Sequence, residues 1–251
     1  MLVRFWGTRG SLPVALTADA VRGKIREALV RGIETGLDSA DAVDDFVDNE
    51  LGFSVTGTFG GSSSCVEIEH GASTELVVCD AGSGLRGLGT RLAESHRANG
   101  VVVNLFVSHP HWDHIMGFPF FTPAYVPGNT VRIYACHEAA ESVFRTQNSA
   151  PYFPVDFNAL GANIEFITLT PGETVSVAGL DVTPAKQRHG GDSYGFRFSD
   201  GKRTVVYSTD GEHKLEEPDE LTAVIDFYRD ADLVIFDAMY SLADAISLKE
   251  D

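Results

Sequence analysis

The fold and the chemistry of this chain are decided by SHPHWDH, residues 108–114. This stretch directly follows the apolar run 101–107, which predicts a strand buried on both faces. Residues two apart in an extended segment face the same side, so we expect His109 and His111 to point at one metal ion. Asp113 and His114 follow just past the predicted turn and are expected to face a second ion. Imidazole and carboxylate groups suit zinc, manganese or iron, so the stretch predicts a metal centre.

The composition is that of an ordinary globular protein. Of its 251 residues 43% are hydrophobic and 22% are charged, which is typical of a globular protein. The length suffices for one large domain or two small ones, and we expect one domain spanning 1–251. No apolar run approaches the roughly 20 residues of a membrane helix, and residues 1–6 lack the pattern of a signal peptide. We therefore expect a cytoplasmic protein. A net charge of −17 disfavours binding to long nucleic acids and to anionic membranes.

Cysteine contributes little to the predicted site. Cys65, Cys79 and Cys136 are odd in number and widely spaced, without a CxxC pair, which disfavours disulfide scaffolds and thiolate zinc sites. Each lies in an apolar, strand-like stretch, so we expect buried structural thiols.

Many predicted strands and fewer helices indicate a layered α/β fold with sheets inside and helices outside. The expected strands are 2–6, 65–69, 76–79, 101–107, 131–135, 164–169, 180–184, 194–198, 204–208 and 233–236. The expected helices are 17–36, 39–51, 85–98, 138–146 and 219–229. A Gly/Ser-rich loop covers 57–64, and residues 14–56 read as a helical insertion that would serve as a lid or a dimer contact.

The motif H-x-H-x-D-H after a buried strand resembles the central signature of the metallo-β-lactamase superfamily. Further segments resemble one hydrolase branch close to its phosphodiesterase-like members; they are VRFWGTRGS at 3–11, FGGSSSC at 59–65, DAGSGLR at 80–86, YSTD at 207–210 and DLVIFD at 232–237. The resemblance implies a four-layer αββα sandwich with a site for two divalent metal ions, zinc in the first place, at one edge of the sheets.

The same resemblance assigns the ligands. His109, His111 and His189 would hold the first ion, Asp113 and His114 the second, and Asp210 would bridge both. Catalysis would use a shared hydroxide, since two cations lower its pKa towards neutrality. Asp113 and Asp210 are thus the carboxylates expected at the reacting centre. Asp80 and Asp237 are not assigned as ligands but are candidates to accept hydrogen bonds from ligating histidines.

The chain departs from the family pattern in one respect. The family has a further histidine after the motif that contains Asp237, whereas this sequence has none after His213. We expect either a sequence that lacks its C-terminal elements or an altered second metal site, and we favour the first. His213 is a weaker candidate to replace the missing ligand.

Two other interpretations are disfavoured. GSGLRG at 82–87 matches a dinucleotide fingerprint, but the acidic residue expected at the end of the next strand is replaced by the metal motif. The glycines are better explained by close packing of strand and helix. The tRNA 3′-processing endonucleases of the superfamily carry a histidine where this chain has Phe236, and the acidic composition also weighs against that activity.

The preferred function is hydrolysis of small phosphodiesters or cyclic phosphates. Two alternatives stay open: hydrolysis of a lactone, thioester or β-lactam by the same hydroxide, and an inactive metal-binding regulatory module. A small-molecule substrate is expected, and a homodimer is one interpretation of the insertion at 14–56. Arg9 could meet a phosphate, and Tyr125, Tyr152 and Phe153 could line a pocket, although aromatic residues near prolines more often serve packing.

Overall fold

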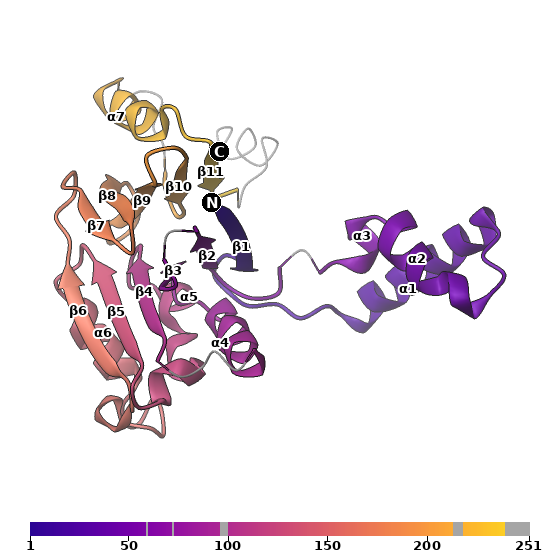
Figure 1. Ribbon diagram of the computed structural model, residues 1–251, viewed down its shortest axis with the longest axis horizontal. Helices are drawn as coiled ribbons and strands as arrows, with labels where there is room; N and C mark the ends of the chain where they lie inside the picture. Colours follow the sequence, from indigo (N-terminus) through magenta and orange to yellow (C-terminus); the bar gives the residue numbers. More distant parts are fainter. Residues whose placement is uncertain (59, 72, 96–99, 213–217, 239–251) are drawn as a thin grey trace, which may run out of the picture.

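A computed structural model describes the chain except residues 59, 72, 96–99, 213–217 and 239–251, and the side chains of 218–221. Its larger sheet has six strands in sequence order (Figure 1). They are β1 (Leu2–Gly7), β2 (Cys65–Glu69), β3 (Leu76–Cys79), β4 (Val102–Val107), β5 (Thr130–Ala135) and β6 (Asn163–Thr168). The first two pairings are antiparallel and the strands from β3 to β6 are parallel, so the carboxyl ends of β3 and β4 meet at one edge.

The second sheet has five strands in the order β11-β10-β9-β8-β7. Their bounds are β7 (Val175–Val177), β8 (Leu180–Gln187), β9 (Ser193–Ser199), β10 (Thr204–Ser208) and β11 (Leu233–Phe236). All neighbours are antiparallel except β10 and β11. The short β7 was not predicted, and β8 continues three residues beyond the predicted end because its last residues pair with the start of β9.

The alternation along β4 separates two hydrophobic cores. Val103, Leu105 and Val107 belong to the core under the outer helices, whereas Phe106 belongs to the core between the two sheets. There its ring meets those of Phe196 and Phe198 edge-on, at centroid distances of 5.4 and 5.2 Å. The strand is therefore buried on both faces, as predicted.

Helices cover the outer face of each sheet. Leu88 of α4 (Gly84–Glu94) and Phe144 of α6 (Ala140–Gln147) are fully buried against the first sheet. On the second sheet, the guanidinium of Arg197 donates to the carbonyl of Phe227 in α7 (Pro218–Tyr228) at 2.9 Å. The four-layer αββα sandwich is thus confirmed. The prediction that C-terminal elements are missing falls on residues outside the described part of the chain.

An arm between β1 and β2 projects from the sandwich (Figure 1). Its main helix is α1 (Ala18–Thr35), which Thr17 caps and which ends at Gly36 with φ +75°. The predicted second helix, 39–51, is confirmed in its extent by a continuous helical run over 40–50, whose hydrogen-bonding pattern changes along its length. The run consists of η1 (Ala40–Ala42), α2 (Val43–Asp45) and η2 (Phe46–Glu50), and α3 (Phe53–Thr56) follows it.

One aromatic ring packs this helical run against α1. Phe46 is buried beneath α1, where its ring lies against Gly32.

The remaining elements are single turns around the ends of β4 and α6. They are α5 (Trp112–Ile115), η3 (Phe118–Phe120), η4 (Thr122–Tyr125) and η5 (Phe157–Ala159). No helix in the described part of the chain has the length and apolar character needed to cross a bilayer.

Candidate metal centre

The run after β4 turns sharply at α5. His111 is extended (ψ 152°) and its carbonyl accepts from the backbone N–H of His114 at 3.0 Å. The carbonyl of His114 in turn accepts from the backbone N–H of Ala81 at 2.7 Å, which ties the turn to the end of β3. His109 and His114 are buried as a result, whereas His111 is exposed.

Three histidines form the first donor group. His109, His111 and His189 each offer one ring nitrogen within 4.8 Å of the others. Nε2 of His189 lies 3.2 Å from Nδ1 of His111. His189 follows β8, so the second sheet supplies the third member of the group. Burial and, to a smaller extent, the neighbouring His114 lower the pKa of His109 to about 3, so its imidazole is neutral and keeps a lone pair for a cation.

The Asp210 carboxylate lies between two groups of histidines. Its Oδ2 is 3.8 Å from Nε2 of His109 and 3.6 Å from Nε2 of His189, whereas its Oδ1 is 3.4 Å from Nε2 of His114. His109, His114 and Asp210 thereby form a second donor group. Asp113 lies beside it, with Oδ2 3.5 Å from Nε2 of His114.

The donor atoms fit a cation. Nε2 of both His109 and His114 is buried and has no hydrogen-bond partner among the described residues, an arrangement that costs free energy unless another group satisfies the atoms. Burial lowers the pKa of His114, but the carboxylates of Asp80, Asp113 and Asp210 raise it well above its ordinary value. Without a cation a proton on His114 balances these carboxylates, and a divalent ion would take over that role.

Asp80 holds the imidazole of His114 through a hydrogen bond to its Nδ1. It is fully buried and its two oxygens accept from the backbone N–H and the hydroxyl of Ser108, the hydroxyl of Tyr207 and Nδ1 of His114, at 2.6–2.9 Å. A proton held on Nδ1 leaves Nε2, the atom that faces Asp113 and Asp210, free to bind a cation.

The backbone turns at both central carboxylates. Asp80 (φ +60°) follows β3 and Asp210 (φ +49°) lies just past β10, each in the left-handed region that aspartate tolerates better than most residues. Each turn ends a strand and directs the carboxylate into the site. Asp113 is held by a different contact, since its Oδ2 accepts from the backbone N–H of Ser11 in the first loop at 2.8 Å.

Sequence reasoning missed Tyr207 and Ser64. Tyr207 is fully buried, and its hydroxyl lies 2.6 Å from the Ser64 hydroxyl as well as from Asp80. The signal was the alternation in β10, which turns Val205 and Tyr207 towards the core between the sheets. A tyrosine hydroxyl placed there needs a polar partner.

The other predicted residues lie around this centre. Asp237 and Arg9 line a cavity of about 210 Å³ together with His114 and Asp210, and the backbone N–H of Asp237 donates to the carbonyl of Ser208. His213 lies outside the described residues. The hydroxyl of Tyr125 donates to the carbonyl of Pro119, which is a packing role. Tyr152 and Phe153 line a second, larger cavity.

The GSGLRG segment matches the packing expectation. A Cβ on Gly82 would lie 2.4 Å from the carbonyl oxygen of Asp113, and one on Gly84 would lie 2.6 Å from the backbone of Trp6. The glycines thus let α4 and the metal-binding turn approach closely.

Comparison with known proteins places this geometry in a family. Residues 76–246 match the family described as the Beta-lactamase superfamily domain. The human tRNase Z, short form, aligns with a TM-score of 0.59 and 18% identity over 99% of this chain and 82% of its own length. Yeast PDE1 aligns with a TM-score of 0.51 and 14% identity over 70% of each chain.

Other comparisons are weaker. The metallo-beta-lactamase fold protein YhfI from Bacillus subtilis is 22% identical over 69% of this chain, with a TM-score of 0.49, and this chain spans 63% of its length. No curated protein sequence matches. At these identities the structural likenesses establish the fold alone. The family match covers well over half of the chain, however, and this chain therefore belongs to the β-lactamase superfamily, whose members are generally metal-dependent hydrolases.

Proposed function

We propose that this protein hydrolyses small phosphodiesters, cyclic phosphates included, with two divalent cations. Zinc is the first choice, and manganese or iron would suit the same donors. The observation that carries the proposal is the placement of Asp210, whose two oxygens face different histidines. A carboxylate in that position can bridge a pair of ions.

The ligand assignment follows the two donor groups. His109, His111 and His189 would hold one cation, Asp113 and His114 would hold the other, and Asp210 would be shared. When bound, divalent cations supply Lewis acidity, which activates water at neutral pH and stabilises negative charge on a phosphoryl oxygen.

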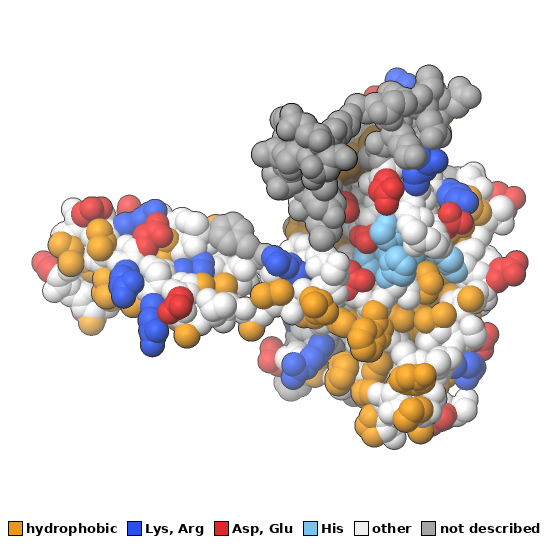
Figure 2. Space-filling view, turned by 180° about the vertical axis from the view of Figure 1, so that it is seen from behind, with side chains coloured by type: hydrophobic (Ala, Val, Ile, Leu, Met, Phe, Trp, Pro, Cys, Tyr) orange, Lys and Arg blue, Asp and Glu red, His pale blue; other side chains and the backbone are white. Residues whose placement is uncertain are grey.

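The protein's own contribution is to hold these donors and leave one side open. Asp80 fixes the proton of His114, and the N–H of Ser11 fixes Asp113. His189 and Asp210 retain 22% and 26% of their side-chain exposure, whereas His109 retains none. The histidines are visible on one face of the molecule (Figure 2), and a substrate would approach from there. The resemblance of the flanking segments to the phosphodiesterase-like branch favours phosphodiesters over carbonyl substrates.

A substrate panel tests the proposal. The metal-loaded chain is assayed with bis(p-nitrophenyl) phosphate, cyclic phosphates, a lactone, a thioester and a β-lactam. We expect turnover of the phosphodiesters that a chelator abolishes and added metal restores. Asp210→Ala should lower kcat at least about 100-fold, as loss of a key electrostatic group does elsewhere. Asp226→Ala, an exposed aspartate paired with Arg229, is the matched control.

The panel also separates the alternatives. Turnover confined to the lactone, thioester or β-lactam would replace the phosphodiester proposal by carbonyl hydrolysis. A metal-loaded chain that turns over none of these substrates would favour the regulatory module. Unchanged activity in Asp210→Ala would contradict the assigned bridge.

A further inference from the structure

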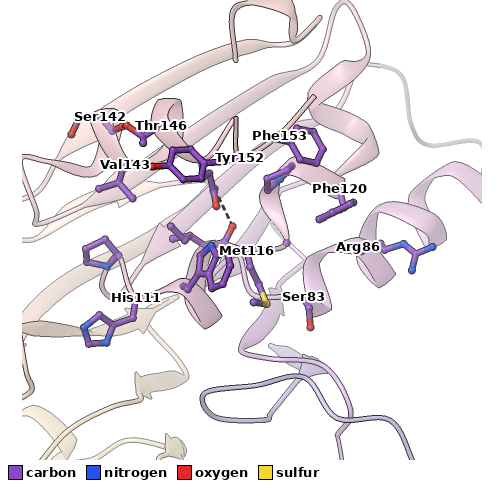
Figure 3. A pocket seen from close by; sticks show the side chains of 16 residues that line it. Ser83, Arg86, His111, Met116, Phe120, Ser142, Val143, Thr146, Tyr152 and Phe153 are labelled. Atoms are coloured by element: carbon purple, nitrogen blue, oxygen red, sulfur yellow. Dashed lines mark hydrogen bonds between the residues drawn. The ribbon is translucent and has the colours of Figure 1, made fainter. Parts of the chain in front are cut away.

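A cavity of about 1220 Å³ opens beside the metal centre, between α4, the turn after β4 and α6 (Figure 3). His111 belongs to both the first donor group of the metal centre and the lining of this cavity. A molecule bound at the metal centre on the His111 side would therefore reach into the cavity. Its volume is somewhat larger than the roughly 300–1,000 Å³ of most small-molecule sites, so a ligand would fill only part of it.

The walls of this cavity are mainly apolar and include four aromatic side chains. Trp112, Phe120 and Tyr152 line it while being 70%, 55% and 73% exposed. Phe153 joins them, with its ring edge-on to Phe120 at a centroid distance of 5.4 Å. Apolar side chains also gather next to the histidines in the surface view (Figure 2). Several large aromatic rings exposed around one hollow indicate a binding site rather than scattered surface residues.

Two hydrogen bonds fix residues that line the cavity. The side-chain amide of Gln147 in α6 donates to the carbonyl of Ile115 at 3.1 Å, which ties α6 to the metal-binding turn. The hydroxyl of Tyr125 donates to the carbonyl of Pro119, the residue next to Phe120. Gln147 and Pro119, which line the cavity, are thus held by hydrogen bonds within the chain.

The charge of the lining differs from that of the whole chain. The chain carries a net charge of −17, yet no aspartate or glutamate is among the described residues that line the cavity. Arg86 of α4 contributes a positive charge, and Ser83 and Thr146 contribute hydroxyls. A lining of this kind admits an anionic ligand and favours a flat ring, because a ring stacks on aromatic faces while its polar edge meets hydroxyls.

We infer that this cavity is a substrate subsite for a planar aromatic group of one or two rings. The substrate class is then an aryl or heteroaryl phosphoester whose phosphate lies at the metal centre and whose ring lies between α4 and α6. The inference rests on the proposed function, because the phosphate is assigned to the metal centre there.

A binding experiment tests the subsite separately from turnover. Isothermal titration calorimetry compares 1-naphthylphosphonate with methylphosphonate on the zinc-loaded full chain; the two probes share the anionic group and differ in the ring. We expect the naphthyl compound to bind at least about tenfold more tightly, since stacking on a protein ring contributes a factor of about 5 to 150.

Variants assign the preference to the cavity. The double variant Phe120→Ala/Tyr152→Ala should lose the preference for the naphthyl compound while binding methylphosphonate as the wild type does. Tyr152→Phe keeps the ring and should keep the preference. Leu29→Ala removes a 64% exposed apolar side chain of the arm and is the matched control. Both truncated rings are exposed, so the double variant should fold. If it does not fold, the single variant Tyr152→Ala is used in its place.

Equal affinity of the wild type for the two phosphonates, or an undiminished preference in the double variant, would overturn the subsite. Phosphodiester turnover is measured on the same preparations. A naphthyl preference without turnover would reject the proposed reaction and keep the subsite, whereas turnover without the preference would reject the subsite alone.

Discussion

Asp80→Asn isolates the role of a buried carboxylate behind the metal centre. One Asp80 oxygen accepts from the backbone N–H of Ser108 at 2.8 Å, and that position requires an oxygen. The amide nitrogen of the variant must then stand where Oδ2 accepts from Nδ1 of His114 at 2.6 Å. A donor at that position forces Nδ1 to act as acceptor and moves the imidazole proton to Nε2.

The size of the effect follows from this change of tautomer. Nε2 of His114 faces Asp210 at 3.4 Å and is the atom proposed to bind the second cation. A proton there occupies the lone pair, so we expect the affinity of the second ion to fall about 10- to 100-fold, the usual cost of losing such a partner. This corresponds to about 1.4–2.8 kcal/mol. The His109, His111 and His189 group is reached less directly, because His109 contacts Asp80 only through the Ser108 hydroxyl, 3.0 Å from its Nδ1, so the affinity of the first ion should fall less than that of the second.

Competition with a chromophoric chelator measures both affinities, and elemental analysis counts the ions per chain. Tyr207→Phe is the matched control, because it removes a different donor to Asp80 and leaves the contact with His114 intact. It should lower the free energy of unfolding by about 1–3 kcal/mol, since the buried hydroxyl of Ser64 loses its partner, with little change in metal affinity. If Asp80→Asn binds two ions as tightly as the wild type, the tautomer argument is wrong.

Three further predictions concern stability. Gly82→Ala places a Cβ 2.4 Å from the carbonyl oxygen of Asp113 and should cost about 1–3 kcal/mol in urea denaturation; an unchanged midpoint would show that the turn can shift freely. Phe144→Ala empties a fully buried site under α6 and should cost about 3–5 kcal/mol, whereas Ile33→Ala, 80% exposed on α1, should stay within about 0.5 kcal/mol. Removing metal with a chelator should lower the Tm, and a free metal concentration of about 100 times Kd should restore about 2.7 kcal/mol; a Tm insensitive to metal would contradict a cation among the buried carboxylates.

The sequence alone determined the structure of the segment around the metal-binding motif. The apolar run before residue 108 and the motif after it were sufficient to predict a strand buried on both faces with a metal-binding turn at its end. Both depend on neighbours within a few positions, where the two-residue period of a strand decides which way each side chain points. The segment 39–51 shows the limit, since its helical extent was predicted but the change from 3-10 to α to π hydrogen bonding along it was not.

The tertiary structure decided which distant residues complete the site. His111 and His189 are 78 positions apart, and Asp80 and Tyr207 are 127 apart; in each case the second sheet supplies the later residue. The aromatic cavity likewise combines α4, the turn after β4 and α6. From the sequence, the resemblance could name His189 and Asp210, but nothing in their own surroundings predicted that Asp210 lies between two groups of histidines. Strand pairing and the packing of one sheet on the other join segments that are far apart in the chain. The spacing of residues within one segment therefore does not predict these contacts.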